Sequence, residues 1–296
     1  MAITKNDAIV LFSSLGLGVS FKKMLTLGRM ELFMSSDEIR ELALKYQQKS
    51  IPEVDVSGGY AEPLYQILGA EKADSMDFSA YEKASIIHDL NQPIEDELKQ
   101  SYSLVMDGGT IEHVFNFPQA IKNCMQMIET GGHYIGITPV NNLMGHGFYQ
   151  YSPELYYRIF SEENGFRVKK MYVNVRTETI SEWYEVADPL QVKTRVVLQN
   201  NLPAHVVVIA EKTAEKNIFE KMPQQSDYSY TWNVHEALSG NQAALKESGG
   251  MLLYRKFFPR RLKIILHNLY DILFKEKAQD HYIGNFNPAH YKKINL

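Results

Sequence analysis

The segment SYSLVMDGGTIEHVFNFPQAIKNCMQMIETGGHYIGITP, residues 101–139, decides the fold class. An apolar run (102–107) ends in a double glycine. The helical pattern that follows, over about 116–129, ends at Gly131, and another apolar run stops at Pro139. A strand, a helix and a second strand in this order form a βαβ unit, whose strands lie parallel in one sheet. The sequence therefore predicts an α/β fold.

Strand and helix patterns alternate on both sides of this segment. Such alternation predicts a mostly parallel sheet with helices on both faces, and its two late strands can form an antiparallel edge. The first 212 residues are expected to form this domain. The further patterns occur at residues 22–28, 72–79, 84–90, 152–164, 167–176 and 204–212.

The composition excludes several classes of protein. With 296 residues, 45% hydrophobic and 22% charged, the chain is neither disordered nor collagen-like. Its net charge of -4 gives no basic field for nucleic acid. Cys124 is the only cysteine, which excludes an intramolecular disulfide and indicates a cytoplasmic location. Residues 1–18 are too short to span a bilayer and lack a signal-peptide cleavage site, so we expect a helix there.

Residues 213–296 are expected to form a C-terminal extension. The alternation stops there, and a basic, aromatic-rich helical segment covers about 251–277. From 254 to 294, nine basic residues face three acidic ones, a charge of +6 that leaves -10 on the rest of the chain. Such an amphipathic helix can attach to an anionic membrane surface. Alternatively, its apolar side packs on the body or on another subunit of a homo-oligomer.

Glycine and acidic residues stand where the predicted strands end. Ligands of open α/β sheets bind at the carboxyl ends of the strands. Asp77 follows the glycine turn at Gly59 by 18 residues, which is typical of an acid that binds a nucleotide ribose. Asp77 and Asp89, at the ends of the second and third predicted strands, can each instead simply begin a turn. The strand-end residues are Gly28, Asp77, Asp89, Asp107 and Gly108.

The succession of these motifs resembles class I S-adenosylmethionine-dependent methyltransferases. Residues 101–139 are similar to the family's region from the fourth to the fifth strand, where a Glu-His pair, a helix, a Gly-Gly turn and a final proline follow in order. The resemblance covers about residues 22–212. It implies a Rossmann-like sheet of seven strands, S-adenosylmethionine as methyl donor and S-adenosylhomocysteine as product. The matching residues are Glu112, His113, Gly131, Gly132 and Pro139.

The resemblance also implies cofactor-binding roles. SMDFS (75–79) is similar to the family's second strand, so Asp77 is expected to bind the ribose. ASIIHDLNQP (84–93) is similar to the third strand, where Asp89 and Leu90 would contact adenine. Asp107 and Gly108 would line the same crevice from the fourth strand.

The chain departs from the family at its first motif. The family has a glycine-rich turn directly behind the first strand, whereas only Gly28 stands here. We interpret residues 29–57 as an insertion, so that Gly58 and Gly59 allow the close approach of the cofactor's methionine part. Ser103 is a second departure, because the family often has an acid in the fourth strand.

Two histidines are candidates for a general base. Methyl transfer requires alignment and desolvation of the acceptor, and a hydroxyl acceptor also requires a base. His146 lies between two glycines in the loop after Pro139, and His113 belongs to the Glu-His pair. A structural role is the alternative for each histidine.

The loop of residues 141–153 is the predicted acceptor pocket. Aromatic and amide side chains commonly line ligand sites. The aromatic residues of the next helix are interpreted as core. No H-E-x-x-H or similar spacing appears, so the sequence predicts no metal site. The candidate pocket residues are Asn141, Phe148, Tyr149 and Tyr151.

The sequence predicts a methyltransferase for a small-molecule or glycan-like hydroxyl or amine acceptor. No nucleic-acid partner is expected, and membrane contact is expected only through the C-terminal helix. The missing first motif favours the alternative, a non-catalytic binding or scaffolding protein that kept the fold and lost the cofactor chemistry.

Overall fold

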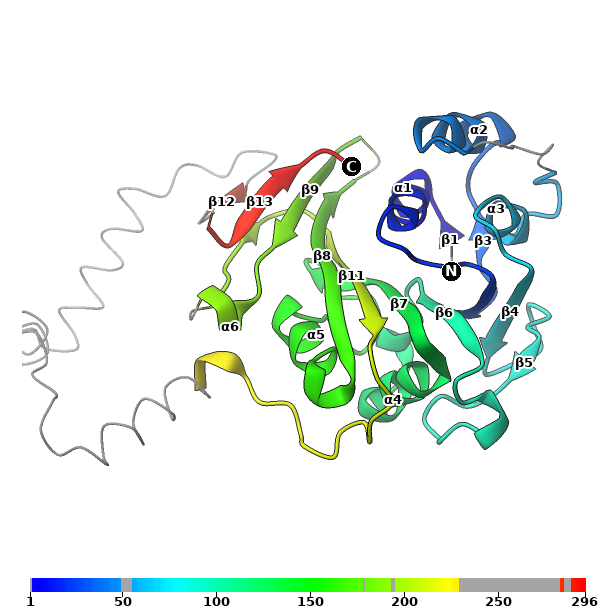
Figure 1. Ribbon diagram of the computed structural model, residues 1–296. Helices are drawn as coiled ribbons and strands as arrows, with labels where there is room; N and C mark the ends of the chain where they lie inside the picture. Colours follow the sequence, from blue (N-terminus) through cyan, green and yellow to red (C-terminus); the bar gives the residue numbers. More distant parts are fainter. Residues whose placement is uncertain (1, 49–54, 178, 193–194, 229–282, 285–288) are drawn as a thin grey trace, which may run out of the picture.

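The chain forms one large mixed sheet with helices on both faces (Figure 1). The computed structural model describes residues 2–48, 55–177, 179–192, 195–228, 283–284 and 289–296. In spatial order, the strands are β5 (Ile86–Ile87), β4 (Lys72–Asp77), β2 (Lys23–Leu27), β6 (Tyr102–Asp107), β7 (Ile128–Asn141), β11 (Ala204–Lys212), β8 (Phe166–Arg176), β9 (Ser181–Val186) and β13 (Tyr291–Ile294).

Most strands of this sheet run in one direction. The strands from β5 to β7 are parallel, and β11 is antiparallel to both of its neighbours, β7 and β8. β9 is antiparallel to β8 and β13. Numbered by chain position, the parallel strands have the order 3-2-1-4-5 of a doubly wound fold. The predicted α/β class, with a mostly parallel sheet, is confirmed.

The predicted count of seven strands is wrong, because β9 and β13 extend the sheet to nine. β13 is short and carries two lysines, Lys292 and Lys293, so it shows no apolar run in the sequence. Lysines are typical of edge strands, where they discourage pairing with another chain. β13 lies in the predicted C-terminal extension, yet it forms the edge of the main sheet. The predicted basic helix at 251–277 lies outside the described residues.

The helices cover the two faces of the sheet (Figure 1). One core joins α1, α2 and α3 to side chains such as Leu104 and Met106, and the other joins α4 and α5 to Val105. β6 is therefore buried on both faces, as expected for a central parallel strand. The helices are α1 (Lys5–Leu15), α2 (Ser36–Lys45), α3 (Glu62–Ile67), α4 (Phe117–Met127), α5 (Pro153–Ile159) and α6 (Pro189–Val192).

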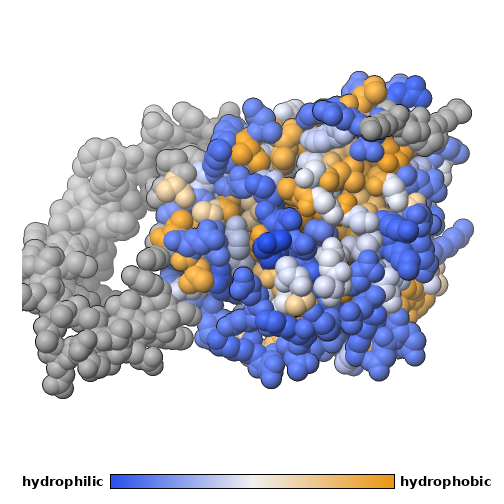
Figure 2. All heavy atoms as spheres, in the orientation of Figure 1, coloured by the Kyte–Doolittle hydropathy of each residue, from blue (hydrophilic) through white to orange (hydrophobic). Residues whose placement is uncertain are grey.

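Short elements complete the structure. Four of the two-residue strands form two small sheets. None of the described helices is long and apolar enough to cross a membrane. On the face drawn in Figure 2, apolar atoms gather over α1 and α3, and hydrophilic residues cover the lower part. The paired short strands are β1 (Ala2–Ile3) with β3 (Glu31–Leu32) and β10 (Gln199–Asn200) with β12 (Ile283–Gly284). The 3-10 helices are η1 (Asp96–Leu98), η2 (Ile111–His113) and η3 (Glu162–Asn164).

The segment around Gly131 differs from its prediction. α4 passes directly into β7 at Ile128, so Gly131 and Gly132 lie within the strand rather than in a turn before it. Gly131 has a φ of 88°, and the pairing of β7 with β6 shifts its register at this end. The glycine pair therefore forms a local irregularity that β7 passes through.

Candidate functional site

The carboxyl ends of β2, β4, β5, β6 and β7 lie along one edge of the sheet, because these strands are parallel. Gly28 ties two of these ends together, since its N–H donates to the carbonyl of Met76 at 2.6 Å. The φ of Gly28 is 74°, a conformation that favours glycine. The predicted strand-end residues therefore share the edge at which α/β proteins bind ligands.

Asp77 and Asp89 stand at the ends of the neighbouring strands β4 and β5, and both are partly exposed. Oδ1 of Asp77 accepts the Ser79 N–H at 3.1 Å. Oδ1 of Asp89 accepts the backbone and side-chain N–H groups of Asn91 at 2.9 and 2.8 Å, which lower the pKa of Asp89. Oδ2 of each carboxylate accepts no hydrogen bond from the described residues, so both remain able to bind hydroxyl or amino groups. Leu90 is buried in the core and offers little surface to an adenine ring.

The place behind β2 is occupied by Arg29, which the sequence reasoning missed. Its Nε donates to Glu62 at 2.6 Å, and its guanidinium carbon lies 3.7 Å from the centre of the Tyr60 ring. The turn at Gly58 and Gly59 is instead held against β3, where the Gly59 carbonyl accepts the backbone N–H at position 32. The predicted contact of this turn with a cofactor stays a prediction.

Asp107 shapes the turn behind β6. Its Oδ1 accepts the N–H groups of Gly109, Thr110 and Ile111 at 3.2, 2.8 and 3.4 Å, and the Tyr134 hydroxyl donates to Oδ2 at 3.2 Å. Complete burial raises the pKa of Asp107 to about 6, although these hydrogen bonds oppose the rise. The predicted cofactor contact of this side chain does not fit its burial, because Oδ1 is bonded to the turn and Oδ2 to Tyr134.

Gly108, also a predicted cofactor residue, lies in that turn. A Cβ at this position would approach Cε of Met30 to 2.7 Å. The glycine therefore lets the side chain of Met30 pack against the turn.

Glu112 is the most unusual residue of the site. Its side chain is fully buried, and neither oxygen has a hydrogen-bond partner. Nε2 of His146 lies 3.3 Å from Oε1, but without the geometry of a hydrogen bond. Burial, and then the charge of Asp107, raise the pKa of Glu112 to about 8. A buried carboxyl group without partners is costly, which makes Glu112 a candidate functional residue.

The loop that carries His146 lies directly on Glu112. The Phe148 N–H donates to the Glu112 carbonyl at 2.8 Å. Gly147 has a φ of 72°, and a Cβ there would lie 2.9 Å from both Cγ and the carbonyl oxygen of Glu112. Only glycine therefore permits this approach, which encloses the carboxyl group.

The two candidate bases, His113 and His146, lie side by side. Their ring centres are 5.1 Å apart in an edge-to-face arrangement. Burial, and then the charge of His146, lower the pKa of His113. One donor atom from each histidine and one from Glu112 lie within 4.8 Å of one another. The sequence did not indicate this three-donor cluster, because its third member comes from a distant loop.

A cavity of about 280 Å³ adjoins the cluster. His205 on β11 lines its wall, and burial, followed by the charge of Arg176, lowers the pKa of His205 to about 3. Arg176 donates to Oδ1 of Asp7 in α1 at 2.7 Å. The sequence reasoning missed His205, Arg176 and Asp7. In the sequence, each is marked only as a polar residue next to an apolar run. The other lining residues are Ala2, Ile3, Gly108, Gly109, Glu112, His113, Ile137 and His146.

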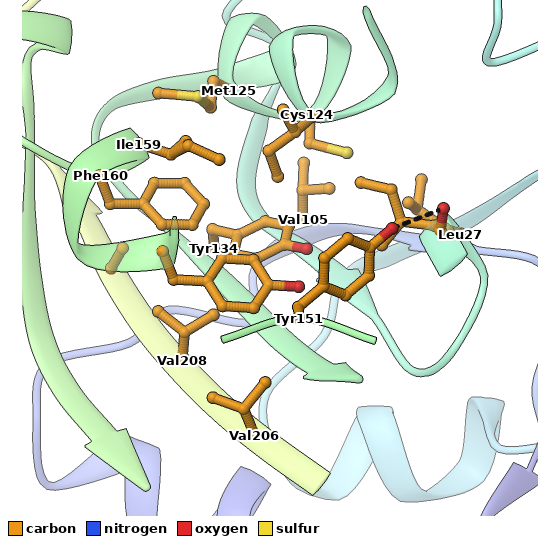
Figure 3. Packing of buried hydrophobic residues seen from close by; sticks show 14 of the residues in the cluster. Leu27, Val105, Cys124, Met125, Tyr134, Tyr151, Ile159, Phe160, Val206 and Val208 are labelled. Carbon is orange, nitrogen blue, oxygen red and sulfur yellow. Dashed lines mark hydrogen bonds between the residues drawn. The ribbon is translucent and has the colours of Figure 1, made fainter. Parts of the chain in front are cut away.

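The predicted acceptor residues separate into exposed and buried ones. Phe148 is exposed and contacts exposed Phe115 edge to face at 5.9 Å. The Tyr149 hydroxyl donates to the Phe115 carbonyl, and the Asn141 amide donates to Asn200. Tyr151 was expected in the pocket, but it lies in the core beside Tyr134, with its hydroxyl bonded to a backbone carbonyl at 3.1 Å (Figure 3).

Known proteins with similar structures share little sequence with this chain. No protein-family model and no curated protein sequence matches it. A protein from Bacillus halodurans, provisionally described as a methyltransferase, has a TM-score of 0.40 and 8% identity over 70% of this chain and 99% of its own. A SAM-dependent methyltransferase from Thermotoga maritima has a TM-score of 0.35 and 13% identity over 69% of this chain and 89% of its own. A branched-chain polyamine synthase from Thermus thermophilus has a TM-score of 0.36 and 11% identity over 76% of this chain and 62% of its own.

At these low TM-scores the likenesses support no conclusion about activity. The strand order is the stronger observation. The parallel strands from β5 to β7 have the doubly wound order, and the antiparallel β11 lies next to β7, as in a Rossmann-like sheet. On that order, the chain has a Rossmann-like, doubly wound α/β fold.

Proposed function

We propose that the chain transfers a methyl group from S-adenosylmethionine to a hydroxyl group of a small-molecule or glycan-like acceptor. One arrangement supports this function: two strand-end carboxylates and a cavity that contains histidines lie along the same edge of the sheet. The carboxylates suit a nucleoside, and the histidines suit an acceptor that must lose a proton. An amine acceptor needs no such base once it is neutral, so the histidines favour the hydroxyl.

Different residues of the chain would bind the cofactor and the acceptor. Asp77 would bind the ribose hydroxyls and Asp89 the adenine amino group, because each keeps one carboxylate oxygen without a partner among the described residues. When bound, the cofactor supplies a methyl group that is already activated on a sulfonium centre.

The acceptor would occupy the cavity next to the histidines. His146, whose side chain is half exposed, would accept the hydroxyl proton, and His113 beside it provides the second imidazole. The exposed rings of Phe115 and Phe148, each two residues after one of the histidines, would hold an apolar or sugar face of the acceptor. Ala2 and Ile3 of β1 also line this cavity and would give it an apolar part.

Binding of the cofactor is the first property to test. We expect calorimetric titration of the full chain with S-adenosylmethionine and S-adenosylhomocysteine to show saturable micromolar binding. Asp77→Asn should weaken this binding at least about tenfold, since it loses charged hydrogen bonds to the ribose. Asp96→Asn is the matched control, because Asp96 is an exposed aspartate whose carboxylate, among the described residues, contacts only Lys99.

Absence of binding by a chain that is folded by circular dichroism would overturn the proposal. A non-catalytic binding or scaffolding protein would then be favoured. Arg29 supports that second candidate, because an arginine with two hydrogen-bonded contacts stands where the resemblance expects a glycine-rich turn.

A further inference from the structure

We infer that Glu112, His113 and His146 bind a divalent transition-metal ion beside the acceptor cavity. The inference rests on the arrangement of these three side chains and does not depend on the methyl donor. Of the described residues, these three are the group of histidine, cysteine or acidic side chains whose donor atoms come close enough to share one ion.

The geometry requires only small movements. Metal–nitrogen and metal–oxygen bonds of about 2.0–2.2 Å place neighbouring ligand atoms roughly 3–4 Å apart. Oε1 of Glu112 and Nε2 of His146 already lie 3.3 Å apart, and the three donor atoms lie within 4.8 Å of one another. Both imidazoles are exposed, so their rings can rotate toward a shared ion without disturbing the core.

The buried carboxylate points to a missing cationic partner. Glu112 is enclosed from two sides by Gly109 and Gly147, where a Cβ would lie within 3.2 and 2.9 Å of its side chain. Its two oxygens have no hydrogen-bond partner, and no lysine or arginine forms an ion pair with it among the residues that the structure describes. A buried carboxyl group is stabilised when it stays neutral, is paired or coordinates a metal, and His113 and His146 beside Glu112 supply the further ligands that a metal requires.

The donor set indicates the kind of metal. Two imidazoles and one carboxylate suit zinc, manganese, iron(II), cobalt or nickel, whereas magnesium and calcium prefer oxygen ligands. Three protein ligands leave coordination positions open, as in catalytic metal sites. The three residues line the cavity of about 280 Å³, so an acceptor hydroxyl or a water there could bind the ion and lose its proton more easily, and the ion would then replace His146 as the group that promotes loss of the proton.

The experiment uses the full chain after removal of metals with a chelator. Titration with Co²⁺, followed by visible absorption, and with Zn²⁺, followed by calorimetry, should show one equivalent bound per chain. We expect Glu112→Gln and His146→Gln each to weaken the binding of both ions at least about a hundredfold. His88→Gln is the control, because the His88 ring contacts the carbonyl of Gln92 and His88 is not part of the three-donor cluster, so binding should be unchanged.

Thermal unfolding separates loss of the site from loss of the fold. Glu112→Gln should unfold at the same temperature as the metal-free wild type or higher, because a neutral amide is easier to bury than an unpaired acid. His146 is on an exposed loop, so His146→Gln remains informative even if Glu112→Gln fails to fold. Wild type that binds neither ion, or two variants that bind as wild type does, would overturn the site. Because no methyl donor is present, failure here is distinct from failure of the proposed methyl transfer.

Discussion

Asp107 illustrates how a single residue at a strand end can serve the backbone rather than a ligand. Its buried carboxyl group accepts three backbone N–H groups and thereby fixes the turn that leads to Glu112 and His113. The position of these two functional side chains therefore depends on one acceptor oxygen. We expect removal of that oxygen to lower the free energy of unfolding, and removal of the negative charge alone not to lower it.

The first prediction separates the acceptor from its charge. Asp107→Ala leaves three N–H groups of the turn without their acceptor, so we expect the free energy of unfolding to fall by about 2–4 kcal/mol. Asp107→Asn keeps Oδ1 and should be neutral or stabilising at pH 7. Urea unfolding of both variants measures the difference, and equal losses in the two would show that the charge, not the acceptor, matters.

The same residue makes stability depend on pH. Burial raises the pKa of Asp107 from 3.8 to about 6, so the folded chain holds this proton more tightly than the unfolded chain does. The contribution of Asp107 to stability is therefore full below pH 3.8, declines as the pH rises to about 6 and stays low above it. The advantage of Asp107→Asn over wild type should grow across this range, as urea unfolding at pH 4, 5, 6 and 7 would measure. A difference that is constant with pH contradicts the raised pKa.

At the scale of elements, the site depends on how closely the loop after β7 approaches η2. Gly147 makes this contact possible, since it combines a positive φ with backbone contact to Glu112. The neighbouring Gly145 has neither feature, because an added Cβ there would meet no atom within 4 Å. The two glycines that flank His146 therefore differ in what they do.

We expect Gly147→Ala to destabilise the chain by about 1–3 kcal/mol and to lift His146 away from Glu112. Gly145→Ala should change stability by less than about 0.5 kcal/mol. Denaturant unfolding measures both variants, and cobalt binding reports whether the loop has moved. Equal effects of the two substitutions would mean that the loop does not depend on the close contact.

The sequence predicts the strands and helices that position this site better than the contacts between its side chains. Residues 101–139 predict the βαβ unit and bring Gly108 and His113 to the correct edge, because local apolar periods determine strands and helices. The pairing of His113 with His146, by contrast, depends on a loop that folds back through Gly147. Tyr151 could not be placed from the sequence, because an aromatic residue in a loop can equally line a pocket or fill the core.

For the whole molecule, the cavity is closed by segments far apart in the chain. Asp7 in α1 accepts a hydrogen bond from Arg176 at the end of β8, and also from the backbone and hydroxyl of Thr4. The ion pair is largely buried, with side-chain exposures of 5% and 20%. It fastens the N-terminal segment, including β1, over the edge of the sheet.

We expect Arg176→Met to reduce the free energy of unfolding by about 2–4 kcal/mol, because it leaves the buried Asp7 without its cationic partner. Hydrogen exchange of residues 2–7 should also become faster. Lys293→Met is the control, since its pair with Glu182 is exposed and should contribute about 1 kcal/mol or less. Protection of residues 2–7 that does not change would show that other contacts hold the segment.

The pairing of β13 with β9 also determines the order in which the chain can assemble. β9 ends at Val186, whereas its partner begins at Tyr291, so the two strands meet only after a long stretch of chain has been made. Contacts of such high sequence separation form late, because the entropy of closing the intervening loop must be lost first. During synthesis on the ribosome, β9 therefore remains an unpaired edge after all residues of the cavity, up to His205, have been made, and a nascent chain is most open to mispairing at that edge.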